Sequence, residues 1–204
     1  WLTARDHPLV ARVLVNQIWQ RTFGEGLVRT PEDFGLQGEQ PTHPALLDWL
    51  AVELHESNWD LKHMLRLMVT SRTFRQDSSW RKDIEDPENR LLARAPRQRL
   101  QAEFIRDHAL AVSGLLVDKR GGAGVHPYQP AVLFGRNAIG AAGASFKQGS
   151  GDDLYRRSLY TYWKRQIPAA NIRILGANGR NACRTRRERT NTPLQALVLL
   201  NDPQ

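Results

Sequence analysis

Apolar residues recur every three or four positions in five stretches of the chain, a spacing that places them on one face of a helix. The stretches lie at residues 9–19, 46–54, 61–69, 100–112 and 194–200. Residues suited to helix N-caps precede four of them: Asp6, Thr42, Asp60, and either Asn191 or Thr192. Three tryptophans, at positions 19, 49 and 59, accompany these helices and are expected in the core. The pattern therefore predicts a mainly α fold.

The chain between the fourth and fifth of these helices lacks such a period. After a helix expected from about Pro96 to Val112, nine of the fifteen glycines lie between Gly114 and Gly151 and predict a long Gly-rich loop. Such loops are usually functional or disordered, and the sequence does not decide between the two. Partial alternation from Arg156 to Ile167 predicts one or two short late strands. The expected architecture is a helical domain with a helical hairpin at 42–69, the loop and these strands.

The composition excludes several classes of protein. Apolar residues make up 41% of the chain and charged residues 25%, which excludes collagen, coiled coils and wholesale disorder. No apolar run approaches the roughly 20 residues of a transmembrane helix. The single cysteine, Cys183, excludes an internal disulfide framework, a four-thiolate zinc site and an attached c-type haem. The six histidines are scattered without zinc-type spacing, so no metal site is expected.

Charge is distributed unevenly along the chain, whose net charge is +8. Residues 1–90 hold 11 basic and 14 acidic side chains, whereas residues 91–204 hold 18 basic and 7 acidic ones. Arginine supplies 24 of the 29 bases, and its planar fork of donors matches carboxylate, sulfate or phosphate. Two interpretations stay open: an anion-binding face, or arginines paired with the acidic first half inside one fold.

Two basic stretches in the second half are the candidate anion site. The first interleaves aromatic rings with arginines, so that rings can stack on sugar or base faces while guanidinium groups hold anions. The alternative to anion binding by this stretch is a strand whose aromatic face packs inward and whose arginines pair with carboxylates elsewhere in the domain. The second stretch directly precedes the start of the last helix, which favours negative charge. The candidate residues are Arg156, Arg157, Tyr160, Trp163, Arg165, Arg184, Arg186, Arg187 and Arg189.

Residues for catalysis are less defined. Acids such as Asp33 or Asp48 near arginines would serve a hydrolase or an oxidative enzyme, but glycoside hydrolysis needs two carboxyls at a set distance, which sequence does not supply. No serine lies in a nucleophile elbow. The glycines at 121, 122 and 124 follow Asp118-Lys119-Arg120 and look like a phosphate-binding turn, but the strand and helix that such a turn requires are not predicted around them. Catalytic residues therefore stay unassigned.

Several strings along the chain resemble a known family: a planctomycete-type domain of unknown function that accompanies planctomycete cytochrome c domains in large extracytoplasmic proteins. They are Trp1–Thr3, His7–Val13, Asn16–Trp19, Phe23–Val28, Thr30–Gly35, Pro41–Ala51, Arg99–Glu103, Arg106–Asp107, Arg157–Tyr160 and Thr190–Leu197. The resemblance implies a periplasmic or cell-surface location and neighbouring domains as partners. It also implies that any haem sits on a separate domain of the parent protein, with no cofactor in this segment. We expect one domain, residues 1–204, truncated at both ends.

Three functions follow as hypotheses. The first is an accessory domain of an extracytoplasmic multidomain protein, whose arginine-rich face binds anionic glycan or a neighbouring domain. The second is an enzyme of polysaccharide catabolism, acting as a hydrolase or in a cytochrome-coupled oxidative step. The third is a nucleic-acid-binding module, which the basic charge suggests and an extracytoplasmic address opposes.

Overall fold

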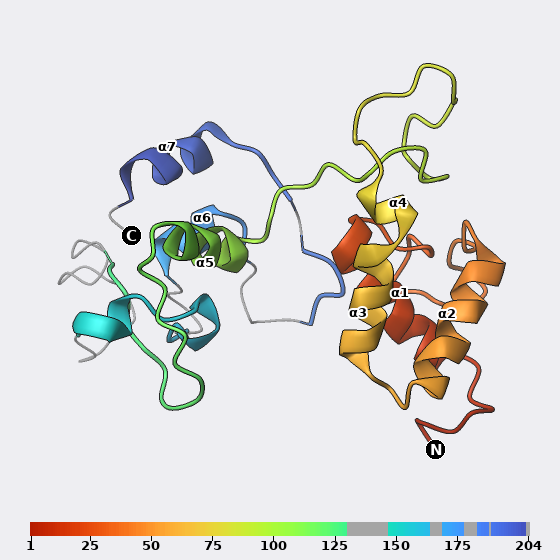
Figure 1. The fold of residues 1–204 in the computed structure, drawn as a ribbon, viewed down its shortest axis with the longest axis horizontal. Helices are drawn as coiled ribbons and strands as arrows, with labels where there is room; N and C mark the ends of the chain where they lie inside the picture. The colour runs from red at the N-terminus through yellow and green to blue at the C-terminus, as the bar shows by residue number, and fades with distance from the viewer. Residues whose placement is uncertain (130–146, 164–168, 178–182, 188, 203–204) are drawn as a thin grey trace. The chain divides into compact units, whose positions relative to one another are not determined.

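The computed structural model describes residues 1–129, 147–163, 169–177, 183–187 and 189–202. Within these ranges the chain forms seven α-helices and no strand, which confirms the mainly α fold (Figure 1). The α-helices are α1 (Val10–Phe23), α2 (Pro44–Glu56), α3 (Leu61–Thr70), α4 (Arg72–Arg75), α5 (Ala102–Val112), α6 (Ala170–Ile174) and α7 (Pro193–Asn201). Two short 3-10 helices, η2 (Gly151–Leu154) and η3 (Ser158–Tyr160), precede α6. None of the described helices is both long and apolar enough to cross a membrane.

The chain divides into two compact units, Trp1–Gln98 and Arg99–Gln204. In unit 1, α1 packs against α2 and α3 around a core of helix side chains that includes Leu54 and Met64, both fully buried. The turn between α2 and α3 is closed by a hydrogen bond from Trp59 N to Leu54 O (2.8 Å), which confirms the predicted helical hairpin. That the chain acts as a single domain stays a prediction.

Two of the predicted N-caps are confirmed. Asp60 caps α3, because its Oδ1 accepts hydrogen bonds from the backbone N–H of Lys62 (2.8 Å) and His63 (3.1 Å). These hydrogen bonds stabilise the ionised carboxylate and lower the pKa of Asp60. Thr192 caps α7 in a reciprocal capping box with Gln195.

The caps predicted at Asp6 and Thr42 are wrong. α1 begins only at Val10, where the His7 ring Nδ1 accepts from the backbone N–H of Leu9 and Val10 (3.3 Å each). Thr42 is instead bonded to the loop before it, since its backbone N–H donates to Leu27 O (2.9 Å). His43 is the residue in front of α2 and makes no side-chain capping bond. At α1 the neighbouring His7 thus replaces the predicted cap, whereas Thr42 is engaged by the more distant Leu27.

Three further predictions need correction. α5 begins at Ala102 rather than near Pro96, because Gln101 is extended (ψ 154°). Trp49 is not in the core but is 51% exposed. The strand predicted from Arg156 to Ile167 is wrong for its described part: residues 156–163 contain η3 and two isolated bridges, Val117–Arg156 and Val125–Thr161. Residues 164–167 lie outside the described residues.

Asn16 connects α1 to the loop that follows it. Its side chain donates to Val28 O (3.0 Å) and accepts from Val28 N–H (2.9 Å), and all of these groups are buried. A Cβ at Gly26 would lie 2.4 Å from Val28 O and under 3 Å from the Asn16 amide, so only glycine fits beside this pair. The buried amide therefore takes the place of a backbone partner for the loop.

We predict that Asn16→Leu destabilises unit 1 by about 2 kcal/mol, because Val28 N–H and C=O would both be left buried without a partner. Chemical denaturation monitored by tryptophan fluorescence measures the loss. Arg21→Ala, an exposed change on the same helix, serves as the control and should stay within about 0.5 kcal/mol of the parent. Equal stability of the Asn16 variant and this control would contradict the assignment.

Unit 2 has a smaller apolar core. Ala102 of α5 packs with Ile172 of α6 and three residues flanking that helix, Ala169, Leu175 and Ala177. α7 joins this core through Gln195, whose amide donates to Ile174 O (3.0 Å) and to Thr190 Oγ1 (3.1 Å). Since the apolar core is small, hydrogen bonds from side chains to the main chain carry much of the organisation of unit 2.

A candidate anion-binding surface on unit 2

The charge asymmetry of the sequence follows the boundary between the units. Unit 2 holds 16 basic against 7 acidic side chains, a net charge of +9, while unit 1 holds 13 against 14, a net charge of −1. In unit 1, arginines pair with acids of the same unit, as in Arg12–Asp48 (2.5 Å) and Arg29–Glu88 (2.7 Å). The surplus of positive charge is therefore carried by unit 2.

Arg156, the first candidate residue, points inward. It is only 2% exposed, and its guanidinium donates to the carbonyl oxygens of Lys119 (3.0 Å), Gly121 (2.5 Å) and Ala123 (3.1 Å). The same group lies over the ring of Tyr160, 4.1 Å from its centroid. Arg156 and Tyr160 thus hold the loop at 119–123 in place, and Arg156 has no surface to offer an external anion.

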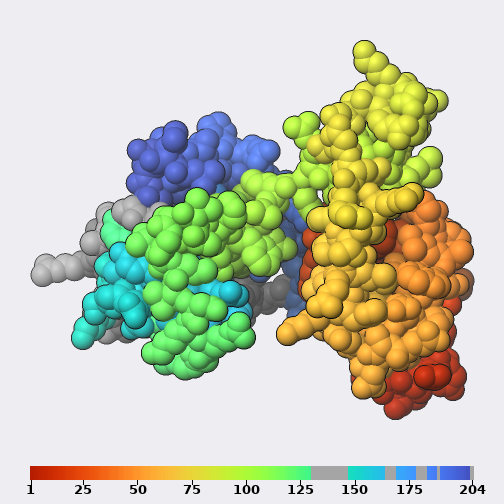
Figure 2. Space-filling view, viewed as in Figure 1, coloured from red at the N-terminus to blue at the C-terminus, as the bar shows by residue number. Residues whose placement is uncertain are grey.

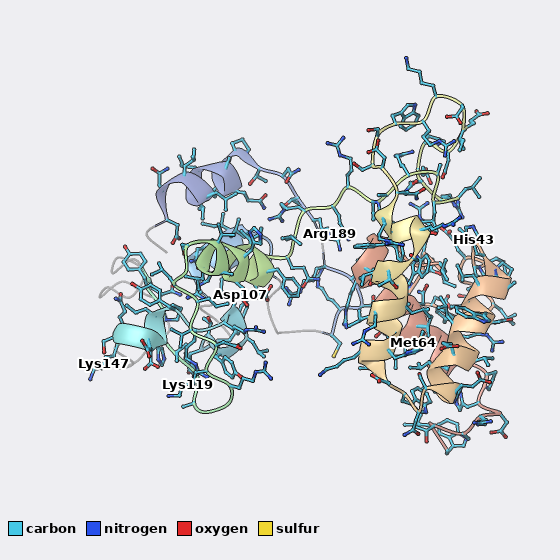
Figure 3. All side chains as sticks on the ribbon, viewed as in Figure 1. His43, Met64, Asp107, Lys119, Lys147 and Arg189 are labelled. Carbon is cyan, nitrogen blue, oxygen red and sulfur yellow. The ribbon has the colours of Figure 1, made fainter. Side chains whose placement is uncertain are left out.

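Arg106 is a buried arginine that the sequence analysis missed. Its guanidinium donates to Leu154 O (2.7 Å) and Arg156 O (2.8 Å), and burial lowers its pKa. The neighbouring Asp107, which Figure 3 labels on α5, accepts from the backbone N–H of Ser158 (2.7 Å). A signal was present: residue 106 lies one helical turn from the buried Ala102 and Leu110, on the inward face of α5.

Two more candidate arginines are paired within unit 2. Arg157 lies 3.1 Å from Asp118, with both side chains half exposed. Arg187 lies 2.6 Å from Glu103 of α5 and is part-buried. Trp163 packs against the small apolar core instead of presenting its ring to solvent. These three residues are thus paired or packed within unit 2, which is the alternative interpretation to an anion-binding face.

The exposed candidates are Arg184, Arg186 and Arg189, which surround Arg187 in the segment before α7. Arg165 lies outside the described residues. A second group of exposed cations, which the sequence analysis did not include in the site, lies on the loop after α5: Lys119 and Arg120, the latter with 85% of its side chain exposed. Figure 3 labels Lys119 on this loop and Arg189 before α7.

The acids considered for catalysis are engaged locally. Asp48 pairs with Arg12 between α1 and α2. Asp33 closes a turn in which its Oδ1 accepts from Gly35 N–H (2.9 Å). Across the described ranges, no three His, Cys, Asp or Glu side chains lie together as they would around a metal ion. Both acids are thus held by partners within unit 1, and catalytic residues stay unassigned.

One protein family matches the chain over its whole length. The profile of PSD1, described as "Protein of unknown function (DUF1553)", matches residues 1–204. The chain belongs to the PSD1 family. No curated protein and no solved structure matches it.

In this PSD1 domain, three of the strings that carried the resemblance have structural contacts within unit 2. In the strings at 99–103 and 106–107, Arg99 donates to Leu175 O (3.0 Å), Glu103 pairs with Arg187, and Arg106 and Asp107 bind the chain around Ser158. The string at 190–197 supplies the capping box and the buried Gln195. These motifs therefore contribute to the folding of unit 2.

Proposed function

We propose that this PSD1 domain is an accessory module whose second unit binds anionic polysaccharide. The observation that carries the proposal is the excess of cations in unit 2, 16 basic against 7 acidic side chains. Three of those acids are already engaged inside the unit: Glu103 by Arg187, Asp118 by Arg157, and Asp107 by the Ser158 backbone. Unit 2 therefore keeps a net charge of +9, and several of its cations, Arg184, Arg186 and Arg189 among them, have exposed side chains.

The chemistry of those side chains suits sulfated or uronic sugars. A guanidinium group binds a sulfate or carboxylate through two parallel hydrogen bonds, which a lysine does not reproduce. Arg184, Arg186 and Arg189 are exposed within six residues of chain, a spacing compatible with successive charges along a polymer. The family resemblance supports the rest of the proposal: a periplasmic or cell-surface location, in a longer protein with a separate haem-bearing cytochrome c domain.

The proposal predicts salt-sensitive binding to acidic glycans. The purified chain, titrated by calorimetry at about 20 mM salt, should bind a sulfated glycan and a polyuronate and should not bind neutral dextran. Raising the salt to about 500 mM should weaken the binding strongly, because exposed charges are then screened. No binding at the low salt concentration would overturn the proposal, since screening is then weak.

We further predict that Arg184→Gln/Arg186→Gln/Arg189→Gln weakens binding by about tenfold or more, because it removes three exposed cations from one segment. The matched control is Lys62→Gln/Arg66→Gln/Arg72→Gln, which removes the same charge from exposed positions of unit 1. The control should retain parental affinity. If both triple variants weakened binding equally, net charge alone would explain the interaction and the assigned surface would be wrong.

A further inference from the structure

The loop at 118–124 is held by its main chain around a buried cation. Arg156 donates to the carbonyl oxygens of three alternate residues, Lys119, Gly121 and Ala123. In a trans peptide the carbonyl and the following N–H point in opposite directions, and no cis bond occurs in the described chain. The N–H groups of residues 120, 122 and 124 therefore point away from Arg156.

The outer side of this loop is open. Gly121 and Gly122 have φ values of +75° and +86°, and a Cβ built at either would meet nothing within 4 Å. The atoms of residues 119–124 lie at the surface of unit 2 (Figure 2). The Gly121 N–H donates to the Tyr160 hydroxyl (2.8 Å), so the Arg120 carbonyl points away from that hydroxyl. Three N–H groups, those of residues 120, 122 and 124, thus face away from Arg156 at an accessible surface.

Positive side chains and an aromatic ring border the same loop. Lys119 and Arg120 are exposed, and Arg157 is half exposed beside Asp118. At the far end, a Cβ at Gly124 would lie 3.7 Å from Tyr162 Cα. The Tyr162 side chain is 53% exposed, with its ring 4.7 Å from that of His126. The loop therefore combines backbone donors, cations and an exposed ring, the groups that bind a charged sugar.

We propose that residues 118–124 form an oxyanion site that binds a sulfate or carboxylate group of an acidic polysaccharide, with the sugar ring against Tyr162. This inference rests on the proposed function and gives it a second, ordered binding position. Arg156 is a positioning residue here: it touches no ligand and sets the direction of the donors. Asp118 lies 3.1 Å from Arg157 and 3.8 Å from Arg120, so it competes with the incoming anion for both cations.

The site is tested on the full chain by ¹⁵N NMR with sodium sulfate and with a sulfated oligosaccharide as probes, against sodium chloride at equal ionic strength. The expected result is saturable shifts of the amide signals of Arg120, Gly122 and Gly124 with both probes and not with chloride. Shifts that grow linearly with ionic strength, or that saturate only elsewhere, would overturn the site.

Variants give a second, independent readout. Lys119→Gln/Arg120→Gln should weaken sulfated-oligosaccharide binding about tenfold, whereas Lys147→Gln/Arg173→Gln, an equal charge change at exposed positions of unit 2, should not. Asp118→Asn should strengthen binding, because the competing carboxylate is removed. Parental affinity of the Lys119/Arg120 variant would overturn the site and leave the proposed function standing. Sulfate bound at the loop without any polysaccharide binding would overturn the proposed function and leave the oxyanion site standing.

Discussion

Replacing Arg106 by methionine is expected to destabilise unit 2 by about 3–5 kcal/mol, since Leu154 O and Arg156 O would lose a charged donor inside the fold. The effect should be confined to unit 2. Native-state hydrogen exchange on the full chain measures it, because amides of α5 and of residues 154–158 would lose protection while those of α1 and α2 would not.

The neighbouring chain offers matched controls for this prediction. Arg106→Lys keeps the charge but not the planar fork, so it should fall between the parent and the methionine variant. Arg157→Gln removes a half-exposed arginine whose partner, Asp118, is equally exposed, and should cost less than about 1 kcal/mol. A methionine variant as stable as Arg157→Gln would show that the buried guanidinium bonds do not hold unit 2 together.

In unit 1 the largest effect is expected from Leu54→Ala. Leu54 is fully buried at the end of α2, and its removal leaves a cavity against α1 and α3, which predicts a loss of about 3–4 kcal/mol. Denaturation followed by tryptophan fluorescence measures it. Val52→Ala, on the same helix but 52% exposed, is the control and should cost less than about 1 kcal/mol. Similar losses for the two variants would contradict the observed core.

The helices of unit 1 were predictable because their signals are local. A stripe of apolar residues and an aspartate directly before it specify where α3 begins, and neither needs information from distant chain. The start of α1 was mispredicted because the His7 ring, rather than Asp6, supplies the acceptor. Trp49 was mispredicted because periodicity identifies an apolar face without defining how far that face is covered.

In unit 2 the arginines could be found from sequence, but their direction could not. Arg156 lies in a basic and aromatic stretch that is typical of an anion site, yet its partners are main-chain atoms more than 30 residues earlier. Carbonyl oxygens carry no sequence signal, so no pattern reveals that this guanidinium is already bound. The same holds for Arg106 and the carbonyl oxygens at 154 and 156.

The hydrogen bonds from Arg156 to the main chain of the loop at 119–123 have a consequence for which substitutions the loop tolerates. Every amino acid carries a carbonyl oxygen, so these hydrogen bonds do not depend on which side chains occupy positions 119, 120 and 123. The positive φ values at 121 and 122, in contrast, favour glycine at both positions. The outer side chains of this loop can therefore be exchanged without loss of the main-chain contacts to Arg156. A change at 119, 120 or 123 is therefore expected to alter the outer surface of the loop at little structural cost.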